Sequence, residues 1–323
     1  MALLELHPNG IYCPPGDFYI DPWGAVDRAV ITHAHRDRAC PGSRRYLTAE
    51  TGVALLGEWL GAEAAIEGLP YGQSLTLGDV RVSLHPAGHI LGSAQVRIER
   101  AGEVWVAAGD YQLAPDPTCA AFDPVPCHTF VTEATFALPI FRWPPESDVL
   151  ASIHAWWRAN REAGRASVLY AHTPGLAERL LASLDASIGP IVAHPEIERF
   201  SRHYRARDIR LAPAASDPSE PAALVLAPPS AHSDAWLRPF AHASHAMVSG
   251  WMRIRGPRRR RALDRGFVLS SHADWPGLLA AIDGARAPTV LATHGHVAPL
   301  VHWLAEHGRT AAPLATRFAE DEA

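Results

Sequence analysis

Short apolar segments that end in histidine or carboxylate residues recur along the chain and predict its secondary structure. Segments with the apolar or alternating character of strands lie at 18–20, 29–31, 80–84, 95–98, 104–108 and 129–133. The polar residues that end or follow them include Asp21, His33, His35, His89, Asp110 and Glu133. The apolar spacing of residues 53–60 predicts a helix. The first part of the chain is therefore expected to carry its polar chemistry at strand ends.

From about Pro144 the pattern changes to alternating helices and strands. The expected helices lie at 149–163, 174–184 and 196–204, and the expected strands at 167–170, 190–193 and 223–226. This alternation predicts a small α/β unit with a mostly parallel sheet. The strand-end pattern returns at 266–271, before His272, and at 288–293, before His294. We therefore predict an α/β protein with a core formed by residues 1–144 and 263–323 and an insertion at 145–262.

The segment Thr32-His33-Ala34-His35-Arg36-Asp37-Arg38 has the spacing of a metal site. Side chains at positions i and i+2 of an extended backbone point to one side, so His33 and His35 can face one point in space. Two imidazoles facing one point suit zinc, and the carboxylate of Asp37 suits zinc or manganese. For this segment taken alone, a polar loop at a strand end is the alternative.

Composition limits the classes of protein that need to be considered. A chain of 323 residues with 48% hydrophobic and 20% charged residues is ordinary for a soluble globular protein. We expect no membrane span and no secretory signal. The four scattered cysteines fit a reducing cytoplasm better than a disulfide framework. The formal charge of -5 argues against general polyanion binding, so a nucleic-acid surface must be local.

Several motifs resemble those of a known enzyme family. The HxHxD segment at 33–37, His89 in Gly-His-Ile-Leu-Gly-Ser, Asp110 in Gly-Asp-Tyr, and Asp21 are similar to the motifs of the metallo-β-lactamase fold. Glu133, His272 and His294 resemble the three additional motifs of the β-CASP nucleases. Within that group, the segments 132–136, 141–144, 249–252 and 271–275 resemble those of the bacterial DNA-ligase-associated exonucleases. The resemblance implies an αββα sandwich with an inserted β-CASP α/β domain.

The resemblance also implies roles for individual residues. His33, His35 and His89 would hold a first metal ion, and Asp110 would bridge toward a second ion held by Asp37 and His294. His296 is a local alternative that we expect to be a loop histidine. Asp21 would orient a ligand rather than bind metal. The catalytic residues would be His272, as the proton donor to the leaving oxygen and oriented by Glu133, together with Asp37 and Asp110.

Arg38 departs from the family pattern HxHxDH, because it stands where the last histidine is expected. Arginine has no lone pair to offer, so it cannot ligate a metal ion. We therefore predict one tightly held ion, Zn²⁺ with Mn²⁺ as an alternative, and a second ion that is weak or absent.

A dense basic run follows Trp251 and is the predicted contact with nucleic acid. It contains Arg253, Arg255, Arg258, Arg259, Arg260, Arg261 and Arg265. Guanidinium groups match phosphates bidentately, and Trp251 could stack on a single strand, although core packing is the favoured role of that ring. A solvated charged loop is the alternative for the run.

The predicted function is a metal-dependent DNA exonuclease of DNA repair, located in the cytoplasm. Its partners would be DNA and, by resemblance, a DNA ligase and a helicase. An RNA-processing nuclease and a degenerate paralogue that only binds nucleic acid are the alternatives. Hydrolysis of a small ester or lactam is disfavoured by the insertion and the arginine run.

Overall fold

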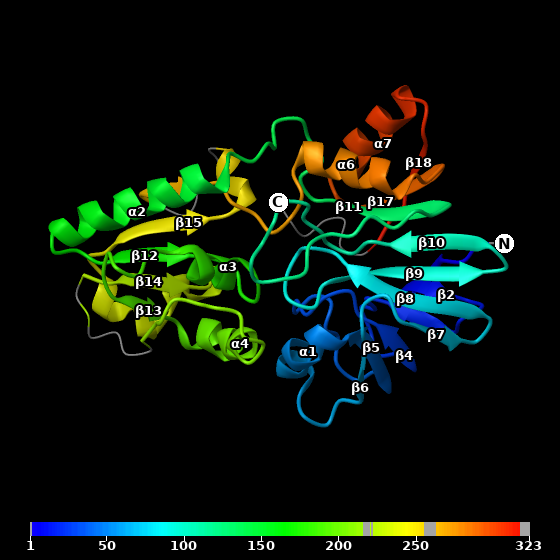
Figure 1. The fold of residues 1–323 in the computed structure, drawn as a ribbon, viewed down its shortest axis with the longest axis horizontal. Coiled ribbons are helices and arrows are strands. Elements are labelled where there is room, and N and C mark those ends of the chain that lie inside the picture. The colour runs from blue at the N-terminus through cyan, green and yellow to red at the C-terminus, as the bar shows by residue number, and fades with distance from the viewer. Residues whose placement is uncertain (1, 216–219, 221, 255–262, 317–323) are drawn as a thin grey trace. The chain divides into compact units, whose positions relative to one another are not determined.

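The protein is described by a computed structural model that covers residues 2–215, 220, 222–254 and 263–316. The chain divides into two compact units (Figure 1). The first unit contains Met1–Phe141 and His272–Ala323, and the second contains Arg142–Ser271. Both units mix helices with sheets, so the predicted α/β class is confirmed. Among the described residues, every helix is too short or too polar to cross a membrane.

The first sheet of the first unit has six strands in chain order. They are β1 (Glu5–His7), β2 (Gly10–Cys13), β3 (Phe18–Ile20), β4 (Arg28–Val30), β5 (Arg45–Ala49) and β6 (Ile66–Leu69). The pairings from β1 to β3 are antiparallel and those from β3 to β6 are parallel. The short 3₁₀ helix η1 (Glu50–Gly52) and helix α1 (Val53–Leu60) connect β5 to β6. The parallel strands β3 and β4 therefore end at the same edge, where Asp21 and Thr32 follow them.

The second sheet has seven strands in the order β18-β17-β11-β10-β9-β8-β7. They are β7 (Ser74–Leu77), β8 (Val80–Pro86), β9 (Ala94–Arg100), β10 (Glu103–Ala107), β11 (Thr129–Ala134), β17 (Thr289–Gly295) and β18 (Thr310–Pro313). Strand β11 pairs in parallel with both β10 and β17. The ends of these three strands therefore lie together, although the chain passes through the whole second unit between β11 and β17.

Two apolar cores hold the first unit together. Phe18 and Val30 of the first sheet share one core with Val96 and Val131 of the second sheet, so the two sheets face each other. Phe130, on the opposite side of β11 from Val131, belongs to the other core. That second core packs the outer face of the seven-stranded sheet against α6 (Trp275–Ala285) and α7 (Val297–Glu306). Side chains alternate along β11, so the strand contributes to both cores close to Glu133 near its end.

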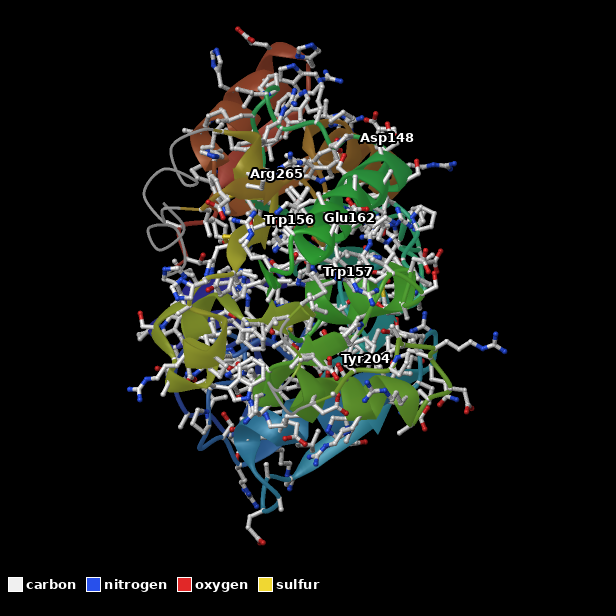
Figure 2. All side chains as sticks on the ribbon, turned by 90° about the vertical axis from the view of Figure 1, so that its left-hand side faces the viewer. Asp148, Trp156, Trp157, Glu162, Tyr204 and Arg265 are labelled. Atoms are coloured by element: carbon white, nitrogen blue, oxygen red, sulfur yellow. The ribbon has the colours of Figure 1, made fainter. Side chains whose placement is uncertain are left out.

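The second unit is built on a parallel sheet of order β13-β14-β12-β15-β16, as the alternating pattern predicted. Its strands are β12 (Ser167–Tyr170), β13 (Ile191–Ala193), β14 (Leu224–Ala227), β15 (Ser244–Val248) and β16 (Arg265–Phe267). Its longer helices are α2 (Glu146–Glu162), α3 (Leu176–Ser183) and α4 (Pro195–Arg205), and its 3₁₀ helices are η2 (Pro229–Ser233), η3 (Ala235–Phe240) and η4 (Gly250–Arg253). Helix α2 buries Trp157 in the core on one face of this sheet, whereas Glu162 at its end is exposed (Figure 2).

Two features of the second unit differ from the sequence-based expectation. Strand β15 was not predicted, because Ser244 and His245 interrupt its apolar pattern; both are accommodated by Asp264, which accepts hydrogen bonds from Ser244 Oγ and His245 N. Strand β16 pairs with β15, so residues 265–267 belong to the sheet of the second unit. The chain consequently returns to the first unit at His272 rather than at residue 263.

Candidate metal centre

Three histidines and one aspartate from separate loops come together in the first unit. His33 and His35 follow β4, His89 follows β8 and Asp110 follows β10. One potential ligand atom of each lies within 4.8 Å of the others. The three imidazole rings have centroids 4.7–4.9 Å apart, and His89 Nε2 lies 3.3 Å from His35 Nδ1. The four side chains therefore converge on one point, as the sequence spacing predicted for His33 and His35.

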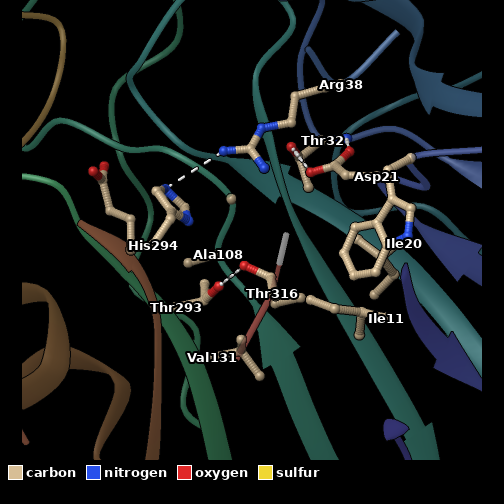
Figure 3. Close-up of a pocket in the computed structure, with 14 residues that line it drawn as sticks. Ile11, Ile20, Asp21, Thr32, Arg38, Ala108, Val131, Thr293, His294 and Thr316 are labelled. Atoms are coloured by element: carbon tan, nitrogen blue, oxygen red, sulfur yellow. Dashed lines mark hydrogen bonds between the residues drawn. The ribbon is translucent and has the colours of Figure 1, made fainter. Parts of the chain in front are cut away.

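The tautomer of His33 is set by a buried hydrogen-bond network, of which Figure 3 shows the contact between Thr32 and Asp21. Thr32 donates its hydroxyl proton to Asp21 Oδ2 at 2.6 Å, and its backbone N–H donates to Asp21 Oδ1 at 2.8 Å. Since that hydroxyl proton is used, the 3.0 Å contact between Thr32 Oγ1 and His33 Nδ1 requires the ring to donate. Nε2 of His33 then carries the lone pair that a metal ion needs.

Burial shifts the pKa values of the two ionisable groups in this hydrogen-bond network, His33 and Asp21. Burial lowers the pKa of His33 well below its usual value, which keeps the ring neutral. Burial also raises the pKa of Asp21 to about 6, against the lowering influence of the Arg38 charge and the Thr32 hydrogen bonds. Asp21 is a non-glycine residue with a φ of 43°, so the turn that delivers its carboxylate is strained. Asp21 reaches the histidines through Thr32, in agreement with an orienting role.

Asp110 divides its two carboxylate oxygens between two groups of residues. Oδ2 lies 3.3 Å from His33 Nε2 and 3.9 Å from His89 Nε2. Oδ1 lies 3.1 Å from His294 Nε2 and 3.3 Å from an Nη atom of Arg38. Burial opposes ionisation of Asp110, but the charge of Arg38 and the hydrogen bond with His294 outweigh it. Together they hold the pKa of this carboxyl well below its usual value.

Glycine before Asp110 permits the close approach of two loops. Gly109 has a φ of 60°, and a Cβ atom there would lie 2.7 Å from Cβ of Thr32. Any side chain at this position would push the loop that carries Asp110 away from the loop that carries His33.

The strand β17 delivers His294 by a bulge. Glu133 pairs with Thr293 and Ala134 pairs with Gly295, so His294 is the extra residue between them. Its φ is 33°, and a Cβ atom on Gly295 would lie 2.5 Å from the carbonyl oxygen of Ala134. The irregularity turns the His294 ring toward Asp110 instead of leaving it in the regular alternation of the strand.

Asp110, Glu133 and His294 form a second group whose possible ligand atoms lie within 4.8 Å of one another. Arg38 enters this group: its Nη atom lies 3.5 Å from His294 Nε2 (Figure 3). Asp37, which we expected as a ligand, pairs instead with Nε of Arg38 at 3.1 Å, and half of its side chain is exposed. Asp37 does not join either ligand cluster, because the buried guanidinium lies on the side where the carboxylate was expected.

His272 and Glu133 form a separate dyad beside the histidine cluster. Nδ1 of His272 lies 2.9 Å from Oε2 of the buried Glu133, whose Oε1 accepts a hydrogen bond from the backbone N–H of Tyr111. The His272 ring lies 4.6 Å, centroid to centroid, from the ring of His89 and is 18% exposed. Gln112 fixes the backbone here by donating to the carbonyl of His272 at 2.7 Å. The dyad therefore reaches the same place as the cluster from another pair of strand ends.

Glu133 and His294 also line a small cavity between the two sheets. Its polar wall contains Asp21, Thr32, Arg38, Glu133 and His294, and its apolar wall includes Ile20 and Val131 (Figure 3). The cavity volume of about 30 Å³ suits one or two water molecules and not a nucleotide. Among the residues of the site, His35 and His272 are partly exposed.

The four residues of the cluster, His33, His35, His89 and Asp110, fit a divalent metal ion. Nε2 of His33 is buried without a hydrogen-bond partner, and it faces the ionised carboxylate of Asp110. Burying a polar atom in this state costs free energy unless a further partner binds it. Three imidazoles with one carboxylate are a donor set that zinc, manganese and related ions accept. The structure supports a metal site here and leaves the identity of the metal open.

The remaining predicted residues lie elsewhere or outside the described part of the chain. His296 stacks on Phe141 with ring centroids 5.8 Å apart and belongs to neither ligand cluster. Arg253 is exposed, Trp251 is half-buried and Arg265 is exposed. The remainder of the predicted nucleic-acid contact, Arg255, Arg258, Arg259, Arg260 and Arg261, lies outside the described residues.

Sequence reasoning missed a second basic segment, on α4 and the turn after it. Its members are Arg199, Arg202, Arg205, Arg207 and Arg210. The spacing of three residues between the first three places them near one another on the helix, and this spacing could have identified the segment. Arg202, Arg207 and Arg210 are exposed, whereas Arg205 pairs with Glu198 at 2.5 Å.

Comparisons with known proteins show similarity in sequence and in structure. No family model matches the chain. A protein of Opitutus terrae (strain DSM 11246 / JCM 15787 / PB90-1) named "Probable DNA ligase" is 30% identical over 305 residues. The match covers 93% of this chain but only 30% of the relative. A crystal structure of a protein of unknown function from Enterococcus faecalis V583 has a TM-score of 0.57 at 14% identity, and the match covers 91% of this chain and 80% of that one. The second likeness concerns the fold alone.

Proposed function

We propose that the protein is a metal-dependent nuclease that hydrolyses phosphodiester bonds of DNA from a strand end. The observation that carries this proposal is the convergence of two devices at one place. The His33, His35, His89 and Asp110 cluster is suited to a divalent ion, and the His272–Glu133 dyad lies one ring away from it. Hydrolysis of a phosphodiester needs both charge stabilisation at phosphorus and a proton for the leaving oxygen.

The residues have separable tasks in this reaction. A divalent ion, when bound, supplies Lewis-acid stabilisation of the charge that develops on the phosphate. Asp21 and Thr32 hold His33 in the tautomer that offers Nε2 to that ion. Asp110 connects the histidine cluster to His294, because its Oδ2 faces His33 and its Oδ1 faces His294.

Proton delivery is assigned to His272. Its Nδ1 faces the Glu133 carboxylate at 2.9 Å, and we assign Nε2 as the nitrogen that delivers the proton to a leaving oxygen. Glu133 is itself anchored by the Tyr111 N–H at 2.9 Å, so the imidazole is oriented by a carboxylate that is fixed in place. Groups of this kind contribute about 10²–10⁴-fold to rate.

DNA is the proposed substrate for two reasons. The sequence relative carries the name of a DNA ligase, and this chain matches less than a third of its length. A nuclease that prepares strand ends and a ligase that joins them act on the same substrate, so we place the protein in DNA repair beside a ligase, with a helicase as a further partner. The motifs also resemble those of the DNA-ligase-associated exonucleases. On this proposal the first unit is the metallo-β-lactamase core and the second is the β-CASP insertion.

An assay with end-labelled strands tests the proposal against its rivals. Matched DNA and RNA, single- and double-stranded and labelled at either end, are incubated with zinc, manganese or magnesium, and the products are resolved by length. Stepwise shortening of DNA is expected, with the label position giving the polarity. Cleavage of RNA alone would favour an RNA-processing nuclease. Binding without cleavage under every metal would favour a degenerate nucleic-acid-binding paralogue.

A further inference from the structure

Asp110 is placed as a carboxylate between two cations. Its Oδ2 faces the histidine cluster, and its Oδ1 faces His294 and Arg38. A carboxylate in this arrangement commonly bridges two metal ions about 3.5–4 Å apart. Here the second position, next to Oδ1, is occupied by the guanidinium group of Arg38.

We propose that Arg38 is a permanent substitute for a second metal ion, so that the centre works with one divalent ion and one guanidinium. The first argument is contact. One Nη atom of Arg38 lies 3.3 Å from Asp110 Oδ1 and 3.5 Å from His294 Nε2, which are the atoms a second ion would take as ligands.

The second argument is the fixed position of the side chain. Arg38 is 6% exposed, and Asp37 binds its Nε atom from the other side at 3.1 Å. Carboxylates at both ends of the guanidinium compensate its burial, which would otherwise be costly. Arginine keeps its charge at every pH at which proteins are folded, and it has no lone pair, so a metal ion cannot recruit it as a ligand.

The third argument concerns the other residue of the second group. Glu133 could supply an oxygen to a second ion, but its Oε1 accepts from Tyr111 N and its Oε2 faces His272 Nδ1. A divalent ion at this position would therefore have to displace the His272 contact and to approach a buried like charge. Asp110 and His294 alone are too few ligands for tight binding, since catalytic sites usually have three protein ligands.

The presence of Arg38 in place of a second metal ion also limits the class of substrate that the site can process. This inference rests on the proposed function. A guanidinium carries a fixed positive charge, so Arg38 beside the ion would stabilise the negative charge of a phosphate by electrostatic attraction, without direct contact. This device needs an anionic substrate. It is of no use to a neutral ester or lactam.

Metal counting tests the proposal without relying on activity. The full-length protein is stripped with a chelator, titrated with Mn²⁺ and followed by elemental analysis and by electron paramagnetic resonance. The wild-type protein is expected to bind one tight equivalent with the signal of an isolated ion. Arg38→His, which removes the charge and adds a ligand, should bind a second ion at least about tenfold more tightly and give the signal of a coupled pair.

Arg38→Gln is the matched control, because it removes the charge without adding an imidazole. It should keep one tight ion and gain less affinity for a second than Arg38→His does. Two tight ions in the wild-type protein would overturn the proposal whatever the variants do. A folded Arg38→His variant, judged by circular dichroism, that stays at one ion would overturn it as well. If the metal counts are as expected and DNA is not cleaved, the proposed function fails and the role of Arg38 stands.

Discussion

Two buried histidines of the first unit and one buried carboxyl of the second unit differ in how their polar atoms are satisfied. In the first unit, Nε2 of His33 and Nδ1 of His294 are buried without hydrogen-bond partners among the described residues. In the second unit, the buried Glu178 next to β12 accepts hydrogen bonds from Thr173 Oγ1 at 2.7 Å, Gly175 N at 2.6 Å and Ser201 Oγ at 3.3 Å. The first arrangement is costly as it stands and is satisfied by binding something, whereas the second is satisfied within the fold.

The histidines of the second unit support the same contrast. The hydroxyl of Tyr170 lies 3.0 Å from Nδ1 of His245 and 3.1 Å from Nδ1 of His232. These histidines have a protein partner, and within the described part of the second unit no group of three possible ligands converges. Histidine content alone therefore does not mark a metal site. What marks one is a set of imidazoles that converge with a carboxylate on one point, as His33, His35, His89 and Asp110 do.

Removing the ligands should have the largest effect and should separate the two units most clearly. His33→Ala combined with His35→Ala takes away two of the four converging groups, so both bound metal and nuclease activity should be lost. Elemental analysis and the end-labelled DNA assay measure the two. His302→Ala, an exposed histidine on α7, is the control and should change neither. Full metal content in the double variant would remove the basis for the metal centre.

Removing the proton donor should have the next largest effect. His272→Ala should lower the rate of cleavage by about 10²–10⁴-fold while metal content stays nearly unchanged, because Nδ1 of His272 faces Glu133 and His272 is not a member of the ligand cluster. A phosphodiester with a nitrophenolate leaving group needs no proton and should recover much of the loss. Loss of metal from this variant would instead make His272 a ligand.

The sequence predicted much of the first site because its residues depend on local spacing. His33 and His35 converge as two residues of one short segment can, and the strands at 18–20, 29–31 and 129–133 lie where their apolar patterns placed them. The pairing of Asp37 with Nε of Arg38 was not predictable from local spacing. It depends on the contacts of Arg38 with Asp110 and His294, which come from β10 and β17.

The boundary of the second unit shows a similar limit. Residues 266–271 carried a recognisable strand pattern, and β16 does form there. The pattern does not say which sheet the strand joins, because pairing with β15 depends on a segment whose own pattern is broken by Ser244 and His245. Local periodicity identified the strand, and tertiary contacts decided where it belongs.

The buried carboxyl of the second unit should make stability depend on pH, with a smaller effect. Burial raises the pKa of Glu178 from 4.5 to about 7, so the folded state binds a proton more tightly than the unfolded state. The free energy of unfolding is then highest below pH 4.5 with respect to this group, and it falls as the pH rises toward 7. At ~1.4 kcal/mol per pH unit, the shift of the pKa corresponds to a total fall of up to about 3 kcal/mol. Urea unfolding measured from pH 4.5 to 8 should show this fall in the wild-type protein and a flatter profile in Glu178→Gln.

Glu162→Gln is the matched control, because this carboxylate is exposed at the end of α2 and should leave the profile unchanged. An identical pH profile for wild type and Glu178→Gln would contradict the account of the buried carboxyl. Nuclease activity at a pH where both proteins are folded should be the same, which would place this titration outside the chemistry of the first unit.

The smallest effect is expected from the exposed arginines on and after α4. If Arg202, Arg207 and Arg210 contact phosphates, changing all three to glutamine should weaken the binding of single-stranded DNA. The loss should be the same for every DNA sequence, because phosphate contacts do not read the bases. With fewer phosphate contacts, fewer counterions are released when the protein binds. At ~0.7 per phosphate on a single strand, the loss of three contacts should make the slope of log affinity against log salt shallower by about 2. Fluorescence anisotropy with a labelled oligonucleotide across a salt series measures this slope. Arg158→Gln is the control, because Arg158 on α2 already pairs with Asp185 at 3.4 Å and should change the slope little. A triple variant with an unchanged slope would assign the phosphate contacts to other arginines, with Arg253, Arg255 and the run at 258–261 as the next to be changed.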